Sequence, residues 1–372
     1  MTFGQLNAGA SDVGAPGGED PRNLALQGAD GLLEQNAEAS IEMHEVEGLS
    51  LGRIVTRRFL RHRAAMICLV ILAITVVLAF TSQGIDAFGV QIHGWWMWTY
   101  SEVPDVINGG EPTLSLVPFN IGIHPLGQDT VGHDMFAQVM RGTQQSLMIV
   151  FLAGIVSTVI GVTLGSIAGY FGGWIDALLM RLTDITIIVP FYLIAAIVGQ
   201  TVGGAGPAFL GIFLGALLWT TLARLVRGEV LALREREFVE AAKVAGASDA
   251  RIIFRHILPN TVGVIIVSAT LTMSATILTE AAISFLGFGV RPPDTSLGLI
   301  ISEYQSAFST RPWLFWWPGL FIVIIALTIN FIGDGLRDAF DPRQRRGLTR
   351  RARRERAMEV EKATAEAAGS AS

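Results

Sequence analysis

The stretch REREFVEAAKVAGASDARIIFRHILPN, residues 234–260, is a polar island in the most hydrophobic half of the chain. It separates two stretches that carry no charge, residues 208–223 and 261–279. Uncharged stretches of about this length are close to what an α-helix needs to cross a bilayer. The island is therefore predicted to be a polar loop that joins two membrane-spanning helices.

The island has the pattern of a helix, a break and a second helix. Residues 235–245 include good helix formers and neither Gly nor Pro. Gly246 suits the left-handed turn that ends a helix, Ser248 is a favourable N-cap, and Pro259 is expected to close the second helix. Small residues leave part of the first helix bare: Ala241, Ala242, Ala245 and Gly246. Such a surface suits docking into a groove of another protein, although an ordinary solvated loop has the same periodicity.

The composition is that of a membrane protein. Hydrophobic residues make up 51% of the chain and charged residues only 16%, which is unusual for a soluble protein. The single cysteine, Cys68, excludes an intrachain disulfide and a cysteine metal cluster. The six histidines lack paired ligand spacing, so no metal site is expected.

Six stretches are long and apolar enough to be predicted as membrane spans. They cover residues 64–82, 146–168, 184–200, 208–224, 262–284 and 314–333. The predicted fold class is thus an all-α membrane protein with six transmembrane helices. The long connections are an outer loop, residues 83–145, and an inner loop, residues 224–260, which contains the island.

The distribution of arginine orients these spans. With the N-terminus inside, the outer loops hold only Arg141, Arg291 and Arg311 of the 27 basic residues. This asymmetry follows the positive-inside rule. Both termini and the island are therefore predicted to be cytoplasmic, in a multi-pass protein of a bacterial or archaeal cell membrane.

The two ends of the chain differ from the central domain, residues 51–340. Residues 1–50 contain nine acidic residues and one basic residue, and they are predicted to form a disordered tail. Residues 341–372 are rich in Arg and then alternate Ala with Glu. We expect a basic tail that contacts anionic lipid or stays solvated, rather than a site for nucleic acid.

Small and hydroxyl residues are spaced along two of the predicted spans. Those of the second span predict close helix packing: Ser157, Gly161, Gly165 and Gly169. Those of the fifth span share one helical face: Ser268, Thr272, Thr276 and Thr279. They indicate either hydrogen bonding between helices or a mildly polar wall of a substrate path. Glu280 follows at the outer end of this span, where it is expected to reach the membrane interface.

The amino-acid sequence of the island resembles that of a known family. Glu240-Ala241-Ala242, Gly246 and Leu258-Pro259 resemble the EAA loop of binding-protein-dependent ABC importer permeases. The ending His256-Ile257-Leu258-Pro259-Asn260 is similar to that of the peptide and nickel permease subfamily. Further similar signatures follow in order along the chain: Gly169-Tyr170-Phe171-Gly172-Gly173-Trp174, Ser284-Phe285-Leu286-Gly287-Phe288-Gly289 and Gly333-Asp334-Gly335-Leu336-Arg337-Asp338.

The resemblance covers roughly residues 51–346 and implies a type I permease (MetI-like) fold. It also implies that an ATPase subunit contacts the island through seven residues: Glu240, Ala241, Ala242, Gly246, His256, Leu258 and Pro259. The partners that it implies are a homologous second permease, two ABC ATPase subunits and an extracytoplasmic substrate-binding protein. Peptides, nickel chelates and related small solutes are the substrates of this subfamily.

The chain itself has no site for ATP. Its two lysines, Lys243 and Lys362, do not follow the Gly-rich pattern of a phosphate-binding loop. ATP and magnesium are therefore expected on the partner ATPase subunits, and this chain is expected to be a transport subunit and no enzyme. The alternative is a secondary transporter or a channel that is not coupled to an ATPase.

Overall fold

The computed structural model describes residues 51–87, 90–202, 205–340 and 358 of the chain. Contacts divide the chain into two units, residues 1–54 and 55–372, and all packing described below is within the second. Helix α2 (Leu51–Phe59) begins in the first unit and ends in the second. The predicted tail at 1–50 and nearly all of the predicted tail at 341–372 lie outside the described residues.

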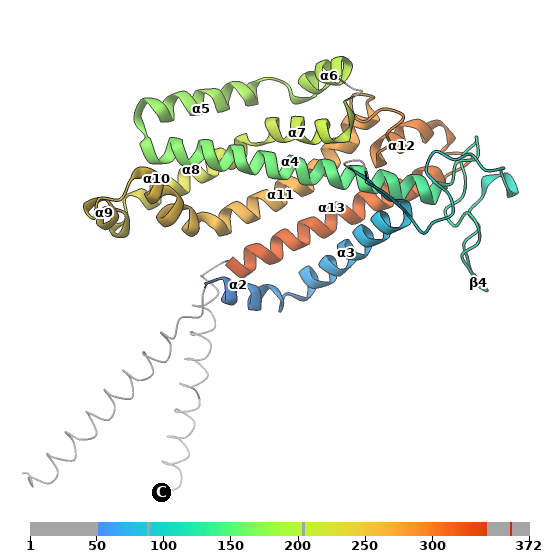
Figure 1. Cartoon of the computed structure of the whole chain (residues 1–372), viewed down its shortest axis with the longest axis horizontal. Helices are drawn as coiled ribbons and strands as arrows, with labels where there is room; N and C mark the ends of the chain where they lie inside the picture. Colours follow the sequence, from blue (N-terminus) through green and yellow to red (C-terminus); the bar gives the residue numbers. More distant parts are fainter. Residues whose placement is uncertain (1–50, 88–89, 203–204, 341–357, 359–372) are drawn as a thin grey trace, which may run out of the picture. The chain divides into compact units, whose positions relative to one another are not determined.

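Among the described residues, four helices are individually long and apolar enough to cross a membrane. They are α3 (Arg63–Gln83), α4 (Met135–Phe171), α13 (Trp313–Phe340) and the 37-residue stretch Asp249–Phe285, which consists mainly of α11 (Leu258–Phe285). Within the bundle, α11 packs against α4 and α13, and α13 packs against α3 (Figure 1). Each contributes buried side chains to one apolar core, for example Ala79, Met140, Ile277 and Ile325.

Two further spans are possible only as bent pairs. Helices α5 (Gly173–Ile188) and α6 (Phe191–Val202) are bent by 76° at their junction, and α7 (Gly206–Leu218) and α8 (Thr220–Arg234) by 45°. If each pair is one span, the described residues hold six. The first bend lies at Pro190, because proline lacks an N–H and moves the preceding residue out of the helical region.

The predicted boundaries of several segments need correction. The predicted spans 184–200 and 208–224 each run across one of these bends. The last part of the predicted outer loop, residues 83–145, is helical, because α4 already begins at Met135. Asp134 caps α4 by accepting a hydrogen bond from the Ala137 N–H at 2.9 Å, which is the usual role of Asp at a helix N-terminus.

The remaining outer segment forms two short hairpins. Strands β1 (Gly84–Ala87) and β2 (Val90–His93) pair antiparallel, as do β3 (Ser115–Leu116) and β4 (Phe119–Asn120). A short 3-10 turn, η1 (Asn108–Gly110), lies between the hairpins in the sequence. Helix α12 (Leu297–Tyr304), followed by η3 (Gln305–Ala307), lies at the same end of the bundle (Figure 1).

The small residues of α4 let α8 approach closely. A Cβ atom added to Gly165 would lie 2.5 Å from the Ala223 carbonyl oxygen, and one added to Gly161 would lie 3.0 Å from that of Trp219. The contact at Gly165 is shorter than real Cβ atoms show, and the contact at Gly161 is tight enough that a larger side chain would push α8 away. The packing role predicted for this stripe is confirmed.

Candidate coupling surface and transport path

The island forms the helix, break and second helix that its sequence predicts. The first helix is α9 (Glu237–Val244), and Gly246 follows with a φ of 78°. Only glycine adopts this left-handed conformation without strain, which explains its place at the end of the helix. Ser248 then caps α10 (Asp249–Arg251) by accepting a hydrogen bond from the Arg251 N–H at 3.4 Å.

The predicted stop at Pro259 is wrong. A π-helical turn, η2 (Ile252–Ile257), follows α10 and continues into α11 with Pro259 in its first turn. Proline removes one helical hydrogen bond and crowds the carbonyl four residues before it. The wider π turn accommodates both effects, so the helix continues without a break from the island into the membrane-spanning part.

The inner side of the island is fixed to the bundle by apolar packing. Val239 of α9 and Ile252 and Ile257 of η2 are fully buried. They form one cluster with three buried residues of α8: Leu222, Val226 and Val230. Each fully buried aliphatic side chain contributes about 1.5–3 kcal/mol. The island is therefore attached to α8 and α11 as a rigid extension.

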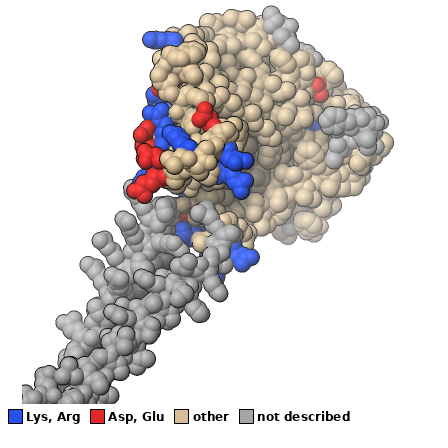
Figure 2. All heavy atoms as spheres, turned by 60° about the vertical axis from the view of Figure 1, so that its left-hand side comes forward, with Lys and Arg blue, Asp and Glu red and all other residues tan. Residues whose placement is uncertain are grey.

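The outer side of the island exposes two large apolar side chains. Val244 is 90% exposed and Phe254 is 71% exposed, although Ile252 and Ile253, which precede Phe254, are buried. Beside them lies an open hollow of about 380 Å³, lined by Ala242, Ala245, Ala247, Arg251, Arg255 and His256. Figure 2 shows that charged side chains gather at this end of the molecule, while most of the remaining surface in that view is uncharged.

The structure brings some of the predicted coupling residues together. Ala242 and His256 line the same hollow, and Glu240, Ala241 and Gly246 are exposed on the island surface. Leu258 and Pro259 instead form the start of α11. The sequence interpretation missed Phe254, because a lone aromatic residue in an apolar run gives no sign of which way it faces.

A second hollow, of about 350 Å³, lies among α5, α6, α7, α8 and α11. Four residues that carry hydroxyl groups, Thr186, Tyr192, Thr220 and Thr279, belong to its otherwise apolar lining: Ile187, Val189, Pro190, Phe191, Ile194, Leu217 and Leu218. Apolar walls with a few hydroxyl groups suit the passage of small solutes with mixed polarity. This hollow is the candidate transport path.

The predicted path residues divide between two roles. Thr279 lines the hollow, whereas Thr276 is fully buried. The hydroxyls of Thr272 and Thr276 donate to carbonyls of their own helix, those of Ser268 and Thr272, at 2.9 and 2.7 Å. The hydroxyls of Thr272 and Thr276 thus stay within their own helix. Ser268, Thr272 and Thr276 do not line this hollow, and Thr279 remains as the path candidate from the predicted set.

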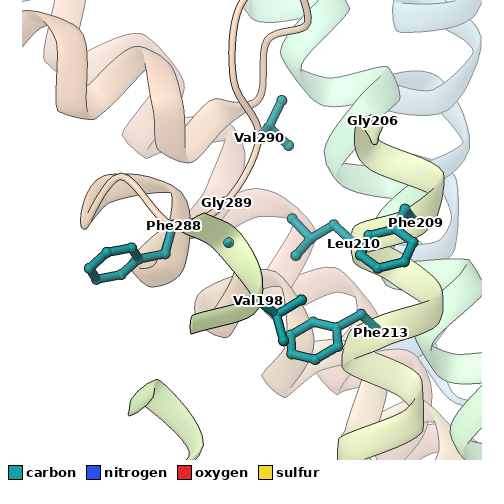
Figure 3. Close-up of a pocket in the computed structure, with 9 residues that line it drawn as sticks. Val198, Gly206, Phe209, Leu210, Phe213, Phe288, Gly289 and Val290 are labelled. Atoms are coloured by element: carbon teal, nitrogen blue, oxygen red, sulfur yellow. The ribbon is translucent and has the colours of Figure 1, made fainter. Parts of the chain in front are cut away.

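A third hollow is lined only by apolar side chains and glycines. Figure 3 shows side chains of α6, α7 and the loop after α11 around it, including Val198, Phe213 and Val290. Gly199 packs so closely there that an added Cβ would lie 2.3 Å from the Phe288 carbonyl oxygen. Because no polar side chain lines this hollow, the region is better explained as helix packing.

The outer segment holds a buried polar network that sequence reasoning did not find. Tyr304 of α12 donates to Asp129 Oδ2 at 2.7 Å, and His133 Nδ1 lies 2.7 Å from the same oxygen. Burial alone would raise the pKa of Asp129, but hydrogen bonds from Tyr304, His133 and the Gly132 N–H outweigh it and lower the pKa. Two of the six histidines, His124 and His133, lie in this segment, and each pairs with one carboxylate.

Comparisons with known proteins identify the class. Residues 161–346 match the family described as binding-protein-dependent transport system inner membrane component. Residues 50–89 match the family described as the N-terminal TM domain of oligopeptide transport permease C. The first match contains the island and the signatures at 169–174, 284–289 and 333–338.

Full-length relatives are similar over most of the chain. The oligopeptide transport system permease protein OppC of Mycobacterium tuberculosis is 38% identical over 306 residues, which cover 80% of this chain and 97% of that protein. OppC of Escherichia coli is 36% identical over 304 residues, covering 82% and 95%. A solved inward-facing structure of the MetNI methionine ABC transporter aligns with a TM-score of 0.43 at 20% identity, covering 56% of this chain and 98% of that chain.

The helical bundle and its polar island thus define a multi-pass permease subunit of the inner membrane. The chain belongs to the family of inner membrane components of binding-protein-dependent transport systems. The family, the type I permease fold class and the membrane location predicted from the sequence are confirmed.

Proposed function

We propose that this chain is one of two permease subunits in an ATP-driven importer of oligopeptides or related small solutes. The names of its relatives support this substrate class. The second permease would be homologous to this chain, and an extracytoplasmic binding protein would deliver the substrate. ATP and magnesium would bind to two separate ABC ATPase subunits, since neither lysine of this chain lies in a phosphate-binding loop.

One observation carries the proposal. The island continues on both sides into helices that wall the candidate path, because Thr220 of α8 and Thr279 of α11 line the same hollow. A partner that moves the island would therefore move two walls of the path. Alternating access by such rigid-body movement is a common form of conformational change in transporters.

The exposed side of the island supports docking to a protein partner. Val244 and Phe254 offer apolar anchors, and Arg251 and Arg255 line the hollow beside them. Exposed aromatic residues next to arginine are typical of the energetically important positions of interfaces. We infer that the ATPase groove contacts this side of the island through Glu240, Ala241, Ala242, Gly246 and His256.

The test is assembly followed by transport. The chain, a co-expressed second permease and the ATPase subunits are purified together in mild detergent and reconstituted into liposomes with the binding protein. We expect a stable complex and oligopeptide uptake that requires ATP. Uptake by this chain without ATPase subunits would overturn the proposal in favour of a channel or secondary transporter.

A further inference from the structure

The elbow between α4 and α5, residues 169–176, contacts α8 and two helices of the island, α9 and α10. From α8, Arg234 Nη1 donates to the carbonyl oxygens of Gly169 and Tyr170, both at 3.3 Å. From α10, Asp249 Oδ1 accepts a hydrogen bond from the Tyr170 hydroxyl at 2.7 Å. From α9, Lys243 Nζ lies 5.8 Å from the centre of the Tyr170 ring. The elbow thus touches the island both before and after its central break.

An ion pair fixes the start of α5 to α8. Asp176 accepts hydrogen bonds from both the Nε and the Nη2 of Arg227, the latter at 2.6 Å. The side chains are only 16% and 32% exposed, and a bidentate pair in partly buried surroundings is among the stronger polar contacts. The Tyr170–Asp249 bond is exposed and contributes less, so Asp176 and Arg227 should dominate this attachment.

Helix α5 extends from the elbow to the candidate path. It starts at Gly173, and near its far end Thr186 and Ile187 line the 350 Å³ hollow. A second ion pair, Asp184 with Arg224 at 2.7 Å, also joins α5 to α8, but both side chains are nearly half exposed, at 43% and 48%. Pairs of this kind contribute little. The elbow is therefore the stronger attachment between the island and this wall.

We propose that the elbow transmits movement of the island to α5, with Asp176 and Tyr170 as positioning residues for ATP-coupled transport. This inference rests on the proposed function. It adds α5 as a third wall of the candidate path that moves, beside α8 and α11, which the island moves directly. When an ATPase shifts the island, α8 and α10 would carry the elbow with them, and α5 would follow as one rigid helix. Without the elbow contacts, ATP hydrolysis would continue while the α5 wall lagged behind.

The experiment compares three variants in the reconstituted complex: Asp176→Asn, Tyr170→Phe and, as the matched control, Asp184→Asn. Each is measured for ATPase association, ATPase rate, thermal stability and oligopeptide transported per ATP hydrolysed. We expect normal association and stability, with roughly tenfold less transport per ATP for Asp176→Asn, the size that loss of one charge-assisted contact gives. Transport per ATP should fall less in Tyr170→Phe, and in Asp184→Asn it should equal that of the wild type.

A charge-exchange variant tests whether the ion pair itself, and not either side chain alone, is required for coupled transport. In the double variant Asp176→Arg with Arg227→Asp, the pair can form in reverse, and transport per ATP should recover relative to Asp176→Arg alone. Unchanged transport per ATP in Asp176→Asn would overturn the elbow proposal while leaving the importer function standing. An equal loss in Asp184→Asn would also overturn it, because the attachment would then not be specific to the elbow. Absence of ATP-dependent uptake by the wild-type complex would instead refute the proposed function.

Discussion

Ser146 of α4 donates a hydrogen bond to the Oε2 atom of Glu280 in α11 at 3.0 Å, and Glu280 is fully buried. Ser284 donates to the other carboxyl oxygen at 2.8 Å, and the Leu297 N–H at the start of α12 donates to Ser146 at 3.3 Å. One carboxyl group therefore joins α4 and α11, and through Ser146 also α12. The sequence places Glu280 near the outer end of its span, and the structure adds that its side chain is enclosed by these helices.

The first prediction concerns this junction. Glu280→Leu should lower the stability of the detergent-solubilised protein by about 2–4 kcal/mol, because it leaves the buried serine hydroxyls without their acceptor. Glu280→Gln keeps an acceptor oxygen and a similar shape, so its melting temperature should stay much closer to the wild type. A melting curve for Glu280→Leu that matches the wild type would show that the junction does not stabilise the fold.

The sequence predicts those parts of the fold that depend on local chemistry. Long apolar runs indicate the spans, and Gly246 with Ser248 marks the break in the island, because turn and cap preferences act over a few residues. The bend at Pro190 has the same local cause and could have been predicted from proline chemistry. The continuation past Pro259 could not, because the chain there can either end the helix or widen it into a π turn.

The parts that sequence reasoning missed depend on contacts between distant segments. Glu280 meets Ser146, which is 134 positions away, and Tyr304 meets Asp129, which is 175 positions away. Neither partner carries a local signal. The outer tryptophans are similar: Trp96 Nε1 donates to Asp134 Oδ2 at 2.8 Å, and Trp98 stacks on His124. Side-chain type alone does not separate these packing roles from contact with lipid.

The second prediction concerns membrane orientation. In a Cys68→Ser background, Ser248→Cys should resist an impermeant thiol reagent in intact cells, whereas Ser101→Cys should react. Both serines are exposed in the structure, so a difference in labelling reports the side of the membrane and not burial. Labelling of Ser248→Cys from outside would contradict the cytoplasmic position of the island.

The third prediction concerns acid stability of the outer segment. The lowered pKa of Asp129 means that its ionised form stabilises the fold above the ordinary pKa of Asp, about 3.9, and that this contribution is lost as the pH falls through the lowered pKa. Tyr304→Phe should lower the free energy of unfolding by roughly 2 kcal/mol at pH 7. The difference in stability between Tyr304→Phe and the wild type should become smaller at acidic pH, because protonated Asp129 no longer offers a charged acceptor.

Melting temperatures of both proteins between pH 7 and pH 3 provide the measurement. Tyr192→Phe is the matched control, because Tyr192 lies on the hollow and is 52% exposed. Its melting temperature should follow that of the wild type at every pH. A gap between Tyr304→Phe and the wild type that stays constant down to pH 3 would contradict the assigned role of Asp129.

The fourth prediction concerns the turn of the island. No atom lies within 4 Å of a Cβ added to Gly246, but its φ of 78° disfavours most side chains. Gly246→Leu should therefore insert and still reduce ATP-dependent uptake more than about tenfold, through a strained turn and added bulk at the docking surface. Gly246→Asn should retain most uptake, since Asn tolerates this conformation. Wild-type uptake by Gly246→Leu would exclude the turn from coupling.

The last prediction concerns Phe254, which the structure exposes on the island. Burying a large aromatic residue in a partner's groove contributes about 2 kcal/mol or more when the residue is an anchor. Phe254→Ala should therefore weaken ATPase association at least tenfold, while the melting temperature of the isolated chain stays unchanged because the side chain is 71% exposed.

The matched control for Phe254 is Phe119 of β4, which is 72% exposed but belongs to the hairpin at the opposite end of the bundle (Figure 1). Phe119→Ala removes the same side chain from a comparably exposed position, so it corrects for any general effect of losing surface apolar area. Association is measured by titrating detergent-solubilised permease with labelled ATPase subunits. If both variants bind as the wild type does, Phe254 is not an anchor. If both weaken binding equally, the effect is not specific to the island. Only a loss confined to Phe254→Ala places the ATPase on the outer side of the island, next to Val244 and the hollow of Arg251 and Arg255.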